Sequence, residues 1–533
     1  MEIQSAALDR EKRAGQSSPS ILVPVLLVAG GVYLRLLFSA ETYLNPDEAY
    51  HFFLANRNSL SLAYQASLGS AHPPLLIVLL YFVREMSASE FVLRLPSVVA
   101  GGLFCWGVYK WLGLTGNRAA ALAGLIFAAY SPSLVSVGSE IRQYSLLLLF
   151  MVAALYCLER SLREFSPAIM LAAALFESLA VLTHYSALLF AGVVGLYGIS
   201  RIDILRNRSS LLAAFLTGQA IVVGIVVELY FAQIRKLNTG GAPQAIAATY
   251  LQATLYDPRR ANFLTFGARA TFRLFHYLFS QPIVAGCVLA LYAAGLVFLW
   301  RTAPLNGTPS RRFALLLVSA PVLNYIAALS RAYPYGGTRH SIWLSLFVIG
   351  GASLGISRLR LPSRSEVAAA ALLMAVCYLL PRPLGAFILP QNQRQSLMSS
   401  AVDYLRHAAP PGSVILLDHQ SNFAFRYYFC RDKVIDFDIP AGSFVDFNCG
   451  EYRVTAPTAS SWMFAPGDLG PAIQHAATRY GLSPGEQVWF FQSGWTVDAE
   501  PALRGRMRDF GCPHPREFGG NIVVCELLPG SSR

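Results

Sequence analysis

Charged residues are scarce in this sequence. They account for 14% of its 533 residues, whereas 54% are hydrophobic and the mean hydropathy is +0.45. A soluble globular domain usually carries about 25% charged residues. The composition therefore excludes an ordinary soluble protein and predicts a membrane protein, with enough chain left for a second module.

Acidic residues are also few, because 30 Asp and Glu face 42 Lys and Arg and the formal net charge is +12. Such a balance can indicate nucleic-acid binding. Here, however, the basic residues are almost all arginines in short clusters between apolar runs. That pattern is typical of orientation signals beside membrane spans, so we expect no nucleic-acid partner.

The sequence shows no internal repeat, and its eight cysteines lack the spacing of a zinc site. Four lie in apolar runs, where we expect them to act as small hydrophobic residues: Cys105, Cys157, Cys287 and Cys377. Four lie in the polar C-terminal region: Cys430, Cys449, Cys512 and Cys525. In an oxidising compartment these would form one or two disulfides of open connectivity, with a zinc site as the alternative.

Long apolar runs dominate the first 380 residues. A membrane-spanning helix needs about 20 mostly apolar residues. Eleven segments qualify: 21–39, 91–112, 119–137, 143–158, 167–182, 185–200, 211–231, 282–300, 313–330, 341–356 and 367–380. The two that flank Thr183-His184-Tyr185 could also form one long tilted helix. The first run is longer than the roughly 7–15 residues of a signal peptide, so we expect it to be retained.

The short loops on one side of these spans are basic, which places them in the cytoplasm. This orientation makes residues 1–19 a cytoplasmic tail and residues 20–384 a membrane domain with outer loops at 40–90 and 232–281. Residues 385–533 are polar and rich in turns, and we expect them to form an extracytoplasmic α/β domain. A helix is predicted at 396–409 and strands are predicted at 414–417, 487–491 and 521–525.

Two adjacent carboxylates, Asp47 and Glu48, follow the first span in the segment Asn45-Pro46-Asp47-Glu48-Ala49-Tyr50-His51. Acidic residues favour a helix N-terminus, so they could simply cap an interfacial helix. Alternatively, one could be a general base for a hydroxyl nucleophile while its neighbour orients it or binds a cation. The residues alone leave both interpretations open.

More polar residues follow, both in this loop and in the other outer loops. The rest of the first outer loop and the start of the next span carry His72, Glu90 and Arg94, and the shorter outer loops carry Glu140, Arg142, His184, Arg339 and His340. Each could be only a charged helix end, and Arg94 could anchor its span by snorkelling. Their common side nevertheless predicts one shared cavity, because ionisable groups near a membrane are costly and usually functional. Arginine also suits a phosphate, since its planar fork can bind two oxygens.

The order of these motifs resembles that of the GT-C superfamily of glycosyltransferases. The motifs are Asn-Pro-Asp-Glu-Ala-Tyr, His-Pro-Pro-Leu, Arg-Leu-Pro-Ser, Ser-Glu-Ile-Arg-Gln-Tyr-Ser-Leu, Thr-His-Tyr and Thr-Arg-His. More narrowly, residues 21–383 resemble the bacterial branch of glycosyltransferase family 39, which is related to protein O-mannosyltransferases and the lipid A aminoarabinose transferase. The resemblance implies a GT-C membrane domain of about 11 spans with a C-terminal extracytoplasmic α/β domain, in the inner (plasma) membrane.

The resemblance also implies a reaction, the transfer of a hexose or pentose from a polyprenyl-phosphate carrier to an extracytoplasmic acceptor. It implies that Asp47 is catalytic with Glu48 in support, and that Arg339 and His340 belong to the donor site. His72 stands where a relative has a lysine facing the donor phosphate, and Arg142 and His184 are further donor-site candidates. The resemblance leaves open a divalent metal, with Asp47, Glu48 and Glu140 as candidate ligands.

The chemistry of the donor predicts an inverting mechanism. A phosphate leaving group needs cations more than an acid, and the acceptor hydroxyl needs a base on the opposite face of the sugar. A transporter or flippase of a lipid-linked sugar is the alternative function, although it would favour repeated halves and ionisable residues at the bilayer midplane. A non-catalytic scaffold would need neither the acidic pair nor the late Arg-His pair. The acceptor remains open among a glycolipid, a polysaccharide and a protein.

Overall fold

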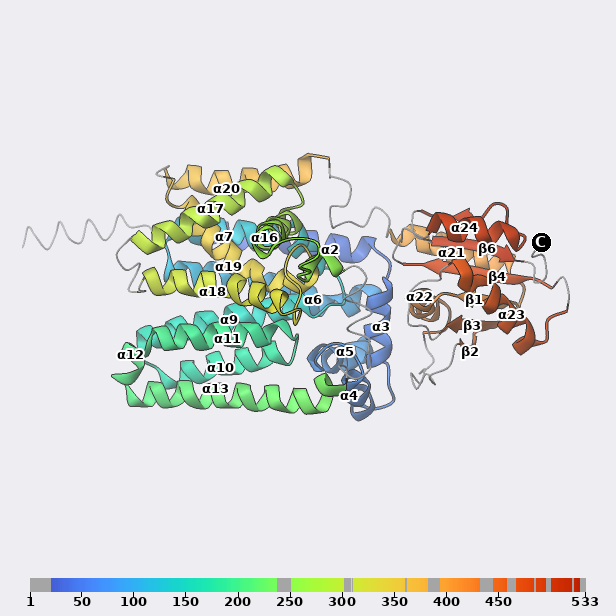
Figure 1. The fold of residues 1–533 in the computed structure, drawn as a ribbon, viewed down its shortest axis with the longest axis horizontal. Helices are drawn as coiled ribbons and strands as arrows, with labels where there is room; N and C mark the ends of the chain where they lie inside the picture. The colour runs from blue at the N-terminus through green and yellow to red at the C-terminus, as the bar shows by residue number, and fades with distance from the viewer. Residues whose placement is uncertain are drawn as a thin grey trace, which may run out of the picture.

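A helical domain and a smaller α/β domain lie end to end in the protein (Figure 1). The computed structural model describes residues 21–236, 251–301, 308, 310–359, 362–381, 394–431, 444–457, 466–483, 486–494, 500–519 and 522–527. The predicted cytoplasmic tail 1–19 and part of the predicted outer loop 232–281 lie outside these residues. The predicted combination of a helical membrane domain with a C-terminal α/β domain is confirmed.

Six helices in the described part of the chain are long and apolar enough to cross a membrane. They are α2 (Leu22–Glu41), α6 (Glu90–Thr115), α9 (Tyr144–Glu164), α13 (Ser209–Leu229, extended by a π-helical turn Tyr230–Ile234), α17 (Pro282–Arg301) and α18 (Ser310–Leu329). Shorter helices occupy the other predicted segments: α7 (Arg118–Tyr130), α10 (Pro167–Val181), α11 (Ser186–Ser200), α19 (Ser345–Ile356) and α20 (Ser363–Leu379). Each of the eleven predicted segments thus contains one of these helices.

The segment around His184 is a break between two helices, not the middle of one tilted helix. Helix α10 ends at Val181 and α11 begins at Ser186. The amide of Ser186 donates to Nδ1 of His184 at 3.2 Å, so the histidine side chain satisfies one of the unpaired amides at the start of α11. The alternative of one continuous helix is therefore wrong.

Short helices link the long ones. Those of the first outer loop are α3 (Pro46–Ala55), α4 (Leu60–Leu68) and α5 (Leu75–Met86). Further along the chain are α8 (Pro132–Val137), α12 (Ile202–Arg206), α16 (Phe263–Phe279) and 3-10 turns at Gln252–Thr254 and Arg339–Leu344. Helices α3, α4 and α5 lie at the end of the bundle that faces the α/β domain, whereas α12 lies at the opposite end (Figure 1).

Helix α3 begins at the acidic pair, and a capping box fixes its first turn. Asn45 and Glu48 form a capping box, in which each side chain accepts a hydrogen bond from the other residue's amide, and Pro46 occupies the first helical position. The helix then buries Phe52, Phe53 and Leu54 against α5. The capping interpretation of the acidic pair is therefore correct for Glu48.

The C-terminal domain is a six-stranded mixed sheet with helices packed against it. The strand order is β2-β3-β1-β4-β6-β5, and β1 pairs in parallel with both β3 and β4. Its strands are β1 (Val414–Leu417), β2 (Phe444–Cys449), β3 (Tyr452–Pro457), β4 (Val488–Ser493), β5 (Arg516–Glu517) and β6 (Ile522–Leu527). Its helices are α21 (Gln395–Ala408), α22 (His419–Cys430), α23 (Leu469–Tyr480), α24 (Glu500–Asp509) and a 3-10 turn, Pro466–Asp468. Disulfides join Cys430 to Cys449 and Cys512 to Cys525.

The α/β domain docks on α3 through α22. Phe423 and Tyr427 of α22 belong to the same buried apolar cluster as Phe52 of α3. The hydroxyl of Tyr428 accepts from the amide of Leu44 at 2.9 Å and donates to Glu90 at 2.7 Å. The α/β domain therefore contacts directly the helix that carries the acidic pair.

Candidate functional site

Glu48 and Arg94 form a buried ion pair next to Asp47. Arg94 donates to both Glu48 oxygens, each at 2.8 Å, and the two side chains are 0% and 1% exposed. The amides of Asn45 (3.1 Å) and Ile141 (2.8 Å) also donate to this carboxylate. A carboxylate has about four acceptor positions, so those of Glu48 are all in use.

Arg94 also fixes the end of α2. Its guanidinium donates to the carbonyl oxygens of Ser39, Thr42 and Tyr43 at 2.7–3.0 Å. The alternative that Arg94 only anchors its span by snorkelling does not hold, because its side chain is fully buried at a junction of chain segments. Its main acidic partner, Glu48, lies 46 residues away and cannot be identified from local sequence, whereas Glu90, four residues before Arg94, lies 3.9 Å from its Nη1 atom.

Asp47 lies beside Glu48 in the chain but has different partners. Its Oδ2 atom accepts hydrogen bonds from Nη2 of Arg142 and from Nη2 of Arg339, the second at 2.8 Å. Burial disfavours the charged carboxylate, but the two guanidinium groups prevail and hold the pKa of Asp47 below its usual range. The side chain is 14% exposed, so it remains within reach of a ligand.

Glu140 completes this charged group. Its carboxylate lies 3.6 Å from Nε of Arg142 and accepts from the hydroxyl of Ser136 at 3.3 Å. Burial and the negative charge of Glu48 raise the pKa of Glu140, and Arg142 opposes the shift. The structure thus brings Asp47, Glu140, Arg142 and Arg339 together from three segments that are far apart in the sequence.

Four histidines form a row beside these charges. The ring centroids are 5.7 Å apart for His51 and His72, 5.6 Å for His72 and His184, and 6.4 Å for His184 and His340. Burial lowers the pKa of His51 and of His184 to about 3. Burial lowers the pKa of His72 and of His340 as well, with His184 and Arg339 as the next causes respectively. At neutral pH these rings are uncharged and can each donate one N–H.

Two glutamines that were not predicted as site residues contact His72 and the residues before it. Gln143 Nε2 contacts Nδ1 of His72 at 3.1 Å. Gln233, in the π-helical turn after α13, donates to the carbonyl oxygens of Ser67 (2.9 Å), Ser70 (2.7 Å) and His72 (2.8 Å). A polar side chain at the end of an apolar span was the available signal for Gln233.

The three carboxylates proposed for a metal do not fit a shared cation. The acceptor positions of Glu48 are taken by Arg94 and backbone amides, and Asp47 turns instead toward Arg142 and Arg339. Within the described ranges, no group of three or more His, Cys, Asp or Glu residues is arranged to hold a metal ion.

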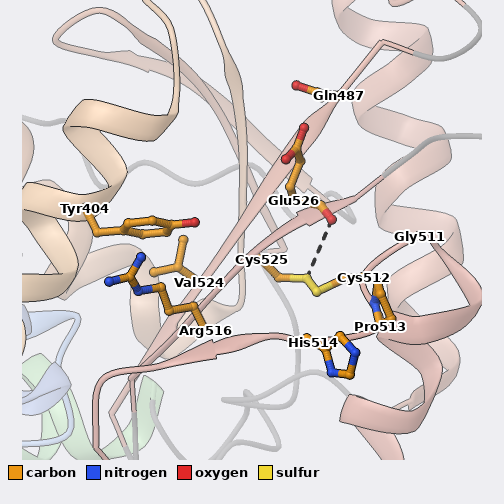
Figure 2. Close-up of a pocket in the computed structure, with 10 residues that line it drawn as sticks. All are labelled: Tyr404, Gln487, Gly511, Cys512, Pro513, His514, Arg516, Val524, Cys525 and Glu526. Carbon is orange, nitrogen blue, oxygen red and sulfur yellow. Dashed lines mark hydrogen bonds between the residues drawn. A yellow bond between two sulfur atoms is a disulfide. The ribbon is translucent and has the colours of Figure 1, made fainter.

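A separate pocket of about 340 Å³ lies in the α/β domain beside the Cys512–Cys525 disulfide (Figure 2). Tyr404, His514, Arg516 and Glu526 are among its lining residues. It contains none of the site residues predicted from the sequence, and its position in the α/β domain separates it from the charged group around Asp47.

Comparison with known proteins identifies one matching family model. Residues 71–231 match the family model described as dolichyl-phosphate-mannose-protein mannosyltransferase. None of the curated proteins compared with the chain gave a significant match. The matched residues make up less than half of the chain but include His72, Arg142 and His184.

Solved structures match over much more of the chain. A crystal structure of ArnT from Cupriavidus metallidurans in the apo state has a TM-score of 0.56 at 12% identity, over 96% of this chain and 98% of that one. ArnT bound to undecaprenyl phosphate has a TM-score of 0.52 at the same identity and coverage. The Archaeoglobus fulgidus oligosaccharyltransferase, in complex with zinc and sulfate, has a TM-score of 0.51 at 12% identity, over 88% of this chain and 68% of that one. The predicted resemblance is confirmed, and the chain has the fold of the GT-C glycosyltransferases.

Proposed function

We propose that this protein is an inverting glycosyltransferase that moves a hexose or pentose from a polyprenyl-phosphate carrier to an acceptor outside the cytoplasm. The observation that carries the proposal is the meeting of one carboxylate with two arginines, Asp47 with Arg142 and Arg339, beside a row of four histidines. Two guanidinium groups match the charge and oxygen geometry of a phosphate. A carboxylate next to them can accept the proton of an incoming hydroxyl.

In the proposed reaction, the acceptor oxygen attacks C1 of the sugar from the face opposite the phosphate. The bond between C1 and the phosphate oxygen breaks, and polyprenyl phosphate leaves with the electron pair. Arg142 and Arg339 stabilise the charge of the leaving phosphate, while N–H groups of His72, His184 and His340 can donate to its oxygens. One displacement inverts the configuration at C1.

Asp47 is the proposed base, which takes the proton of the acceptor hydroxyl. Glu48 is instead proposed as a positioning residue, because its oxygens are occupied by Arg94 and by the amides of Asn45 and Ile141. Glu140 is proposed to help position the Arg142 guanidinium, because its carboxylate lies 3.6 Å from Nε of Arg142.

The fold supports a lipid-linked donor. One ArnT structure of the same fold contains undecaprenyl phosphate, and long apolar helices of this chain expose side chains such as Leu216, Ile283 and Ile326 that suit a lipid environment. The basic short loops favour a cytoplasmic location for the end that carries α12, opposite α3 (Figure 1). We accordingly propose that the site and the α/β domain face the outside of the inner (plasma) membrane.

The test is a transfer assay with the full chain in nanodiscs. A panel of polyprenyl-phosphate sugars with radiolabelled hexoses and pentoses is incubated with glycolipid, polysaccharide and protein fractions of the cell envelope. We expect label to move to one fraction with release of polyprenyl phosphate, and Asp47→Asn to abolish this transfer. Asp203→Asn, in the exposed Asp203–Arg312 pair, is the matched control.

Absence of transfer with every donor and fraction would overturn the proposal. Transbilayer movement of an intact donor in proteoliposomes, without transfer, would instead establish the flippase alternative. Mass spectrometry of envelope glycans and glycolipids from a deletion strain then identifies the missing sugar and its acceptor together.

A further inference from the structure

The carboxylate of Asp47 occupies a position between two cations. A single oxygen, Oδ2, accepts from Arg142 and from Arg339, residues that are 95 and 292 positions away in the chain. Two guanidinium N–H groups converging on one oxygen form the arrangement that a phosphate oxygen would require. The oxygen of the proposed base and an oxygen of the donor phosphate would therefore need the same position.

The charges of the site also allow the donor phosphate to replace the Asp47 carboxylate between the two arginines. A sugar linked to a polyprenyl chain through one phosphate carries one negative charge, as does the Asp47 carboxylate. Of the neighbouring acids, Glu48 is engaged by Arg94, and Glu140 lies 3.6 Å from Nε of Arg142, on a different atom from the one that binds Asp47. Replacement of the Asp47 oxygen by a phosphate oxygen leaves the local charge unchanged and keeps both arginines paired.

The backbone around Asp47 does not depend on this contact. The start of α3 is fixed by the Asn45–Glu48 capping box, and Glu48 is anchored by Arg94 and the amide of Ile141. The Asp47 side chain can therefore rotate away from the arginines while the helix stays in place. Separation from two cations raises the basicity of a carboxylate.

We infer that, in the donor-free protein, the Asp47 carboxylate holds the place of a donor phosphate oxygen between Arg142 and Arg339, and that the donor displaces it. The inference rests on the proposed function and adds an order of events. Asp47 is released to act on the acceptor hydroxyl only after the phosphate has taken over both arginines, so the donor must bind before the acceptor can react.

The test measures the affinity of undecaprenyl phosphate for the full chain in nanodiscs. Displacement of Asp47 opposes binding in the wild type, so removal of its charge should strengthen binding. We expect Asp47→Asn and Asp47→Ala each to lower the dissociation constant by about tenfold, although both abolish transfer. We expect Arg339→Ala to raise it, and Asp203→Asn, which removes an equivalent charge at the opposite end of the bundle, to leave it unchanged.

Equal or weaker binding by both Asp47 variants, with Arg339→Ala still weakening binding, would overturn the displacement while the phosphate site stands. If Arg339→Ala does not change the affinity, or if the wild type does not bind the lipid, the proposed function fails as well. Thermal unfolding is recorded for every variant. Loss of folding in both Asp47 variants would make Asp47 a fixed structural counter-ion and would also overturn the inference.

Discussion

Glu48 and Arg94 form a buried, two-point ion pair between α3 and α6, with Nε–Oε1 and Nη2–Oε2 distances of 2.8 Å. The pair also joins α2 and residue 141, because Arg94 donates to carbonyls after α2 and Glu48 accepts from the amide of Ile141. Adjacent acids of one helix thus have separate roles. Glu48 holds the framework, while Asp47 faces the arginines of the candidate site.

Removal of one partner from this pair should destabilise the protein strongly. In Glu48→Ala, the buried guanidinium of Arg94 would keep only the more distant carboxylate of Glu90, at 3.9 Å, as an acidic partner within the described chain, and breaking a buried pair typically costs about 3–5 kcal/mol. We expect a large fall in the apparent melting temperature in detergent. Glu164→Ala removes the acid of the exposed Arg160–Glu164 pair and should change the melting temperature little, because water screens an exposed ion pair. Equal shifts for the two variants would contradict the structural role of Glu48.

Stability should also depend on pH through the buried histidines. The folded-state pKa of His51 and of His184 is about 3, whereas an unfolded histidine titrates near 6.5. Between these values the unfolded chain binds more protons than the folded chain. The free energy of unfolding is therefore greatest above about pH 6.5 and falls as the pH drops from 6.5 toward 3.

Melting temperatures measured from pH 7.5 to pH 5 check this prediction. His184→Gln should reduce the slope, because one of the buried rings that resist protonation is gone. His407→Gln, which changes an exposed ring in the α/β domain, should leave the slope as it is in the wild type. A wild-type melting temperature that does not change over this range would contradict the prediction.

Arg339 should determine the affinity for the donor. It begins the 3-10 turn Arg339–Leu344 and donates to Asp47 at 2.8 Å. A hydrogen bond to a charged group contributes about 1.5–3 kcal/mol, so Arg339→Ala should raise the KM for the donor by about tenfold or more. Arg259→Ala, an exposed arginine of the same domain, is the control and should not change KM. A fall in kcat with an unchanged donor KM would assign Arg339 to a different step.

Local sequence patterns predicted the helices better than the contacts between them. Each of the eleven predicted apolar runs coincides with a helix, and the acidic pair indicated a helix start as one of two interpretations, because both signals depend on neighbouring residues. By contrast, Glu48 and Arg94 are 46 positions apart in the chain, and Gln233 is about 160 positions from the carbonyl of His72 to which it donates. The hydrophobic periodicity of the sequence does not predict such contacts, because they depend on how the helices pack.

In the α/β domain, too, a local element was predicted whereas an element that makes a long-range contact was not. Strand β1 was predicted with its observed bounds because it is a short, fully buried apolar run. Helix α22 was not predicted, although it makes the contact with α3. Its sequence mixes polar and aromatic residues, since one side packs on the sheet and another, through Phe423 and Tyr427, packs on the membrane domain. The amphipathic pattern is lost when a helix is buried on two sides.

Docking of the α/β domain should contribute to catalysis through α3. The Tyr428 hydroxyl connects α22 to the amide of Leu44, just before the capping box, and to Glu90 at the start of α6. Tyr428→Phe leaves that amide and that carboxylate without this partner and should loosen the position of α3. We expect a fall in kcat of about three- to tenfold, with the KM for the donor nearly unchanged because Arg142 and Arg339 belong to other segments.

Tyr480→Phe is the matched control for this prediction. The hydroxyl of Tyr480 donates to the carbonyl of Val454 at 2.8 Å, wholly within the α/β domain, so its loss tests the stability of that domain without affecting the contact with α3. We expect it to lower the melting temperature slightly and to leave kcat unchanged. If both tyrosine variants reduced kcat equally, the effect would reflect general destabilisation, and the docking contact would have no specific part in holding Asp47.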